Sequence, residues 1–141
     1  MWIANYSLDA VKKGNHIIPQ NDTILIQICD PKQSFPKSPY NTNFVKIFQL
    51  RFLDTNEENN IHSIQENDVE LISEALNFAK NNCYNVIVHC HAGICRSGAV
   101  VEAGTLLGFT VPDGINNRIP NTLVFNKLRK KLGFLNSWES Q

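Results

Sequence analysis

The chain has 141 residues, a length that suits one domain with a sizeable buried core, and we expect a single domain over residues 1–141. Hydrophobic residues make up 43% of the chain and charged residues 18%, a composition that excludes a disordered protein. Thirteen basic and thirteen acidic residues cancel, so the strong positive charge of a general nucleic-acid-binding protein is absent.

The amino-terminal half is expected to alternate short apolar segments with loops. An edge strand is predicted over residues 2–5, and a short helix over 8–13 that ends at Gly14. The β-branched segment 23–29 predicts a buried strand. Three prolines predict a loop over 30–42, and a further strand is expected over 44–52.

The carboxyl-terminal half is expected to alternate helices and strands. Ser63 and Glu66 fit a capping box that opens a helix to about residue 81. A buried strand over 85–89, a helix over 99–107 and a last helix capped by Asn121 follow. This alternation predicts an α/β fold, with a central and mostly parallel sheet of four to five strands flanked by helices.

The four cysteines are expected to be reduced thiols. The first residues lack the basic and apolar regions of a signal peptide, and no apolar stretch approaches the roughly 20 residues that cross a bilayer. We therefore expect a cytoplasmic protein without a membrane partner, where disulfides are rare. Cys29 and Cys83, next to predicted strands, are expected to be small buried hydrophobic side chains.

The segment from His89 to Ser97 carries the most specific chemical signal. Cys90 follows a predicted strand, and Arg96 precedes a predicted helix. The amides of a tight loop and of a helix N-terminus suit a phosphate dianion, Gly93 permits a sharp turn, and an arginine fork binds two phosphate oxygens. The pKa of thiols in such surroundings falls from about 8.5 to roughly 3.5–7.5, so Cys90 is expected to react as a thiolate.

This segment resembles the HCxxGxxR(S/T) signature of cysteine-dependent protein tyrosine phosphatases, and it is most similar to their compact dual-specificity branch. Pro120 and Asn121 resemble the PN segment that supports the loop in that branch, and the likeness covers about residues 44–132. The resemblance implies a phosphatase fold and a phosphocysteine intermediate on Cys90. It also implies Asp54 as general acid, a hydroxyl bond from Ser97 to the sulfur, and supporting roles for His89 and Asn121. The implied phosphate-binding residues are His91, Ala92, Gly93, Ile94, Cys95 and Arg96.

A second resemblance concerns the low-molecular-weight tyrosine phosphatases, because Cys90 and residues 94–97 also fit their CxxxxICRS loop. In that family the loop lies near the amino terminus and an Asp-Pro acid follows it. Here Asp30 and Pro31 form the only such pair, and they precede the loop. Chain order therefore favours the dual-specificity type.

Several roles have alternatives. Glu57 or Glu58 could replace Asp54 as the acid. Cys95 either fills space under the loop or forms a reversible disulfide with Cys90. His89 is expected to brace the loop through hydrogen bonds to backbone, Ser97 could simply cap the following helix, and His91 either shapes substrate preference or is solvated. A metal site is disfavoured, since neighbouring residues at a strand end point to opposite sides and no CxxC pair exists.

We therefore expect a monomeric, metal-independent phosphomonoester hydrolase with no cofactor, acting on a phosphorylated protein or peptide, phosphotyrosine first. The loop contains no lysine, which argues against an inositol lipid as substrate. A rhodanese-like sulfurtransferase and a catalytically silent phosphate-binding module remain alternatives.

Overall fold

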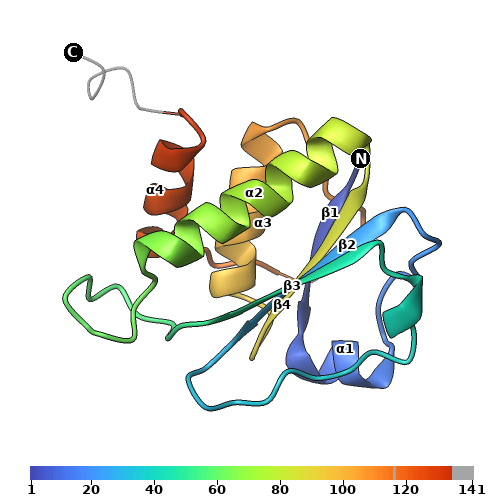
Figure 1. The fold of residues 1–141 in the computed structure, drawn as a ribbon, viewed down its shortest axis with the longest axis horizontal. Helices are drawn as coiled ribbons and strands as arrows, with labels where there is room; N and C mark the ends of the chain where they lie inside the picture. Colours follow the sequence, from blue (N-terminus) through green and yellow to red (C-terminus); the bar gives the residue numbers. More distant parts are fainter. Residues whose placement is uncertain (116, 135–141) are drawn as a thin grey trace.

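The computed structural model describes residues 1–115 and 117–134. Within them four strands form one sheet, namely β1 (Ile3–Ser7), β2 (Thr23–Cys29), β3 (Lys46–Arg51) and β4 (Asn85–Cys90). Their order across the sheet is β1-β4-β2-β3, and all three neighbouring pairs run parallel (Figure 1). The predicted α/β fold with a parallel central sheet of four to five strands is confirmed.

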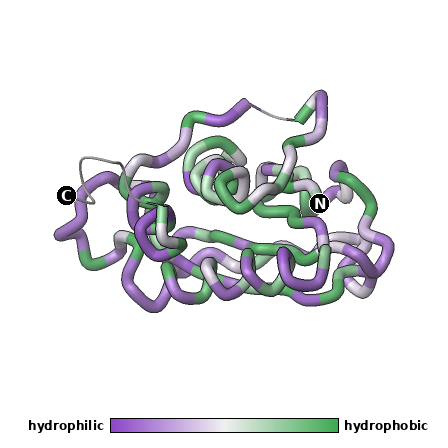
Figure 2. Tube along the Cα trace, turned by 90° about the horizontal axis from the view of Figure 1, so that it is seen from above, coloured by the Kyte–Doolittle hydropathy of each residue, from purple (hydrophilic) through white to green (hydrophobic). Residues whose placement is uncertain are grey.

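Helices and loops cover both faces of this sheet. The helices α2 (Glu66–Asn82), α3 (Arg96–Leu106) and α4 (Thr122–Lys131) share one hydrophobic cluster with the sheet, and α1 (Leu8–Lys13) packs in a second cluster. The buried strand β2 serves both clusters, because Ile24 and Ile26 face the first cluster and Leu25 the second. In Figure 2 hydrophobic residues accordingly follow the central strands.

The parallel arrangement brings the carboxyl ends of the strands to one edge of the sheet. β1 ends at Ser7, β2 at Cys29, β3 at Arg51 and β4 at Cys90. Loops that follow different strands therefore meet at this edge, which is where open α/β sheets bind their ligands. Residues 8, 30, 54 and 91–96 all lie in or next to these loops.

Most predicted elements lie within two residues of the observed ones, and the helix over 8–13 and the strand over 23–29 have the predicted bounds. The predicted capping box of Ser63 and Glu66 is wrong. α2 is capped by Gln65, whose backbone N–H donates to Asp68 Oδ2 at 2.9 Å. The Ser63 hydroxyl instead donates to the Glu58 carbonyl at 3.2 Å, because it lies inside the preceding loop.

Two further predictions need correction. α3 begins at Arg96, three residues earlier than the predicted residue 99, because the Ala99 N–H already donates to the Cys95 carbonyl at 3.0 Å. Cys83 is exposed rather than buried, since it ends α2 in a left-handed conformation at φ +58°. Cys29 is buried, as predicted. In the described ranges, no helix is both long enough and apolar enough to cross a bilayer.

Candidate active site

The Cys90 loop (residues 90–96) connects β4 to the N-terminus of α3. Cys90 ends the buried strand β4 and is only 2% exposed. Its Sγ lies 3.2 Å from Oγ of Ser97, which is in the first turn of α3 and is also buried. The structure thus places the thiol beside a hydroxyl group, at a helix end whose free amides favour negative charge.

The path of this loop depends on Gly93. Its φ is +76°, a value that side chains disfavour, and a Cβ there would lie 2.4 Å from the backbone nitrogen of Ser7. The loop is also hydrogen-bonded to the end of β1, because Asn5 Nδ2 donates to the Gly93 carbonyl at 2.7 Å and the Leu8 N–H donates to the His91 carbonyl at 3.2 Å. These contacts fix the turn against the β1–α1 junction.

Arg96 is buried, with 3% of its surface exposed, and only one side of its guanidinium group is engaged. Nη1 donates to Asp30 Oδ1 at 2.7 Å and to the Phe52 carbonyl at 2.7 Å. Among the residues that the structure describes, neither Nε nor Nη2 donates a hydrogen bond, and Nε is fully buried. Nε and Nη2 form the edge that binds two oxygens of an oxyanion side by side.

Asp30 is a partner of Arg96 that the sequence alone did not indicate. The sequence feature that could have indicated this role is the position of Asp30 directly after β2, at the same sheet edge as the Cys90 loop. Gln33 connects this segment to the Cys90 loop. Its Oε1 accepts from the Asp30 N–H at 3.0 Å, and its Nε2 lies 3.2 Å from His91 Nδ1. His91 is exposed at the rim, so the structure leaves both of its predicted roles open.

The exposed Asp54 lies in the loop after β3, named here the Asp54 loop (residues 54–63). Its Oδ1 accepts a hydrogen bond from Asn121 Nδ2 at 2.7 Å. Of the alternative acids, Glu58 is paired with Lys127, whose Nζ lies 3.0 Å from Oε1, and this interaction lowers the pKa of Glu58. The ion pair with Lys127 on α4 thus favours the charged form of Glu58, whereas Asp54 is held by Asn121; the assignment of the acid stays a prediction.

His89 is fully buried at the end of β4, and burial lowers its pKa from 6.5 to about 4. Within residues 1–115 and 117–134 neither ring nitrogen makes a hydrogen bond of ordinary geometry. An interaction with the Cys90 backbone raises the pKa of the ring, but by less than burial lowers it. The predicted bracing by hydrogen bonds to backbone is therefore limited to this weak interaction with the Cys90 backbone.

Cys95 caps α3, and its carbonyl accepts hydrogen bonds from the Ala99 N–H at 3.0 Å and the Asn121 N–H at 2.9 Å. Burial and then the Asp54 carboxylate raise the pKa of its thiol, which favours the protonated form. Cys90 and Cys95 are both free thiols in this structure, so the disulfide between them stays a prediction.

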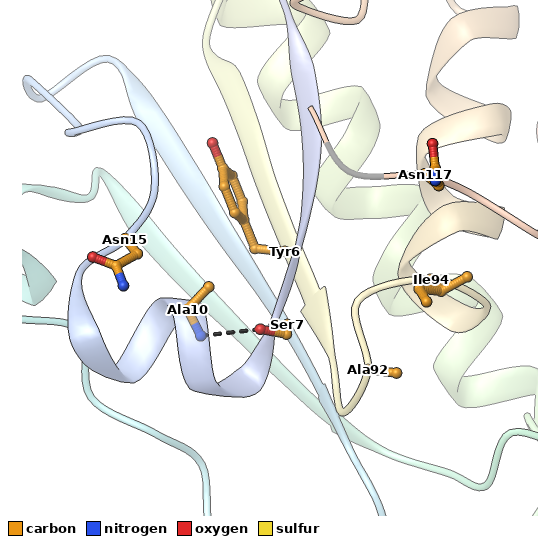
Figure 3. Close-up of a pocket in the computed structure, with 7 residues that line it drawn as sticks. All are labelled: Tyr6, Ser7, Ala10, Asn15, Ala92, Ile94 and Asn117. Atoms are coloured by element: carbon orange, nitrogen blue, oxygen red, sulfur yellow. Dashed lines mark hydrogen bonds between the residues drawn. The ribbon is translucent and has the colours of Figure 1, made fainter. Parts of the chain in front are cut away.

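A hollow of about 490 Å³ flanks the outer side of the Cys90 loop (Figure 3). Its lining comes from β1, α1 and the residue Asn15 that follows it, the loop itself, and the segment between α3 and α4; it comprises Tyr6, Ser7, Ala10, Asn15, Ala92, Ile94 and Asn117. Neither Cys90 nor Arg96 belongs to it. In the described part of the chain, no group of three or more His, Cys, Asp or Glu side chains is arranged to hold a metal ion.

No family model and no curated protein sequence matches the chain. Solved structures do match. A human tyrosine phosphatase-like serine/threonine/tyrosine-interacting protein is 22% identical, with a TM-score of 0.61 over 92% of this chain and 90% of the other. Human DUSP28 is 14% identical, with a TM-score of 0.52 over 95% of this chain and 81% of the other. The predicted phosphatase fold is thus confirmed, and the chain has the fold of these compact, dual-specificity-phosphatase-like structures.

Proposed function

We propose that the protein is a phosphomonoester hydrolase of the protein-tyrosine and dual-specificity type, working through a phosphocysteine on Cys90. One observation carries the proposal. The buried thiol of Cys90 and the Nε–Nη2 edge of buried Arg96, which has no partner among the described residues, belong to one short loop at the start of α3. A nucleophile and an oxyanion clamp in one loop are what phosphoryl transfer requires, since it depends mainly on positioning and charge stabilisation.

The first chemical step would form the phosphocysteine. The amides of residues 91–96 and the Arg96 fork bind the phosphate oxygens, and the Cys90 sulfur attacks phosphorus opposite the ester oxygen. The S–P bond forms as the P–O ester bond breaks, and Asp54 gives its proton to the leaving oxygen. The substrate loses its alcohol or phenol, and the phosphoryl group stays on the enzyme.

The second step would return the enzyme to its starting state. A water molecule gives a proton to the Asp54 carboxylate and attacks phosphorus, and the S–P bond breaks to release inorganic phosphate. The Ser97 hydroxyl, 3.2 Å from the sulfur, can donate a hydrogen bond to the departing thiolate. The alcohol and the phosphate are the only products, so the cycle balances without an oxidant or a cofactor.

The proposal extends to the kind of substrate and protein. Phosphotyrosine in a protein or peptide is the proposed substrate, with phosphoserine and phosphothreonine as further candidates, because a buried thiol is best reached by a long phosphorylated side chain. We also propose that residues 1–141 form one catalytic domain that acts as a monomer in the cytoplasm. His91, Ala92, Gly93, Ile94 and Cys95 would contact the phosphate or shape the rim of the loop.

Hydrolysis of para-nitrophenyl phosphate and of phosphotyrosine and phosphothreonine peptides tests this proposal. Wild type should be active and inhibited by vanadate, and Cys90→Ser and Arg96→Lys should each lose most activity. Cys83→Ser is the matched control, because it removes an exposed thiol at the end of α2, before β4 begins and away from Cys90 at the other end of that strand. Vanadate binding without turnover would indicate a silent phosphate-binding module, and sulfur transfer from thiosulfate a rhodanese-like enzyme. Either result would contradict the proposal.

A further inference from the structure

Asn121 joins three segments that are far apart in the sequence. It is the N-cap of α4 and is 5% exposed. Its Oδ1 accepts from the Val124 N–H at 3.0 Å, and its Nδ2 donates to Asp54 Oδ1 at 2.7 Å and to the Thr55 carbonyl at 3.2 Å. Its backbone N–H donates to the Cys95 carbonyl at 2.9 Å. One residue thus ties the Asp54 loop and the Cys90 loop to the start of a helix.

The helix cap fixes which way the Asn121 amide faces. The Val124 N–H can only donate, so it must meet the oxygen of the amide, and the NH₂ group therefore faces Asp54. An N–H group cannot accept a proton from a carboxylic acid. When Asp54 is neutral, its proton is therefore directed to Oδ2, the oxygen that Asn121 does not hold.

We propose that Asn121 is a positioning residue for Asp54, one that holds Oδ1 so that Oδ2 faces the Cys90 loop and exchanges the catalytic proton. The proton exchange rests on the proposed function, whereas the holding contact does not. The proximity of Asp54 to the loop follows from geometry, because Asn121 donates its backbone N–H to the Cys95 carbonyl at 2.9 Å and its Nδ2 to Asp54 Oδ1 at 2.7 Å. General acid catalysis needs the acid within hydrogen-bond reach of the leaving oxygen, and a mobile exposed carboxylate would meet this condition only part of the time.

The same helix offers a matched control for this role. The Thr122 hydroxyl donates to Asn56 Oδ1 at 3.0 Å, which is a contact between α4 and the Asp54 loop that does not involve Asp54. Thr122→Val removes this hydrogen bond and keeps the shape of the side chain. The Leu123 N–H still donates to the same oxygen at 3.2 Å, so the loop keeps part of this attachment.

The test uses Asn121→Ser, because serine also caps a helix but has no N–H to offer to Asp54. The hydrogen bond from the residue 121 backbone to Cys95 survives this change. We expect kcat/KM for phenyl phosphate, whose phenol is a poor leaving group, to fall about tenfold more than kcat/KM for para-nitrophenyl phosphate, since general acid catalysis contributes roughly 100- to 10,000-fold. Vanadate inhibition should stay unchanged. In an Asp54→Asn background the same substitution should cause no further loss.

Thr122→Val should behave as wild type towards both substrates. If Asn121→Ser lowered kcat/KM equally for both substrates, the role of Asn121 would be overturned. The same holds if Asn121→Ser lowered kcat/KM as much in the Asp54→Asn background as in wild type. Amide hydrogen exchange gives a readout without catalysis: Asn121→Ser should speed exchange in residues 54–58, and Thr122→Val less so. If wild type proves inactive, the proposed function fails, and the exchange result still decides whether Asn121 holds the loop.

Discussion

The buried ring of His89 should make the stability of the protein depend on pH. Burial lowers its pKa from 6.5 to about 4, a difference of about 2.5 units. Each pKa unit corresponds to about 1.4 kcal/mol of difference in the free energy of protonation between the folded and the unfolded state. The ring therefore contributes about 3 kcal/mol to the pH dependence of the free energy of unfolding. This is a large part of the roughly 5–15 kcal/mol that stabilises an ordinary domain.

The sign follows from which state binds the proton. Between pH 6.5 and about 4 the unfolded chain protonates His89 and the folded protein does not. The contribution is therefore complete above pH 6.5 and is lost as the pH falls through about 4. Replacing the ring by a neutral amide, His89→Gln, should remove this part of the pH dependence.

Urea unfolding of wild type and His89→Gln across this pH range provides the measurement. The free energy of unfolding of wild type should fall by about 3 kcal/mol more than that of the variant as the pH drops. Parallel pH curves for the two proteins would refute the reasoning, because they would show that the folded protein holds His89 with an ordinary affinity for protons.

Three other predictions concern the Cys90 loop. Gly93→Ala should abolish activity and lower stability, because the new Cβ would lie 2.4 Å from a backbone nitrogen at the end of β1; unchanged activity and melting temperature would contradict this. Asp30→Ala removes the charged partner of buried Arg96 and leaves only the Phe52 carbonyl on Nη1, so the free energy of unfolding should fall by about 1–3 kcal/mol, and phosphate should stabilise this variant more than wild type. If phosphate stabilised the variant and wild type equally, Asp30 and the bound anion would not compete for the charge of Arg96. Mild peroxide should inactivate the enzyme and dithiothreitol restore it, and Cys95→Ser should recover less; equal recovery would argue against a Cys90–Cys95 disulfide.

The sequence was sufficient for features that depend on neighbouring residues. The β-branched segment before Cys90 predicts a buried strand, and Arg96 with Ser97 predicts a helix start that faces an anion. Both predictions need only local periodicity and loop chemistry, although the helix itself was expected from residue 99 and begins at Arg96. The same local reasoning failed at Ser63, because Gln65 and Asp68 compete for the cap and the structure uses the Ser63 hydroxyl within the loop.

Contacts between distant segments could not be predicted in this way. The pair of Asp30 and Arg96 exists because β2 lies next to β4 in the sheet, and strand order is not readable from one sequence. The hydrogen bond from Asn121 to Asp54 depends on where α4 packs, which is again a property of the whole fold. The sequence therefore indicated the candidate reacting groups, and the structure adds the contacts of Arg96 with Asp30 and of Asp54 with Asn121.

Trapping the enzyme-bound phosphate tests the central claim most directly. Ser97→Ala removes the hydroxyl 3.2 Å from the Cys90 sulfur, so breakdown of the intermediate should slow and phosphocysteine should accumulate. The variant would be mixed with a phosphotyrosine peptide, quenched within its first turnovers and analysed by mass spectrometry of its peptides. We expect one phosphoryl group on Cys90 in Ser97→Ala and none in Cys90→Ser. Continued release of phosphate with no phosphoryl group on Cys90 would contradict the account.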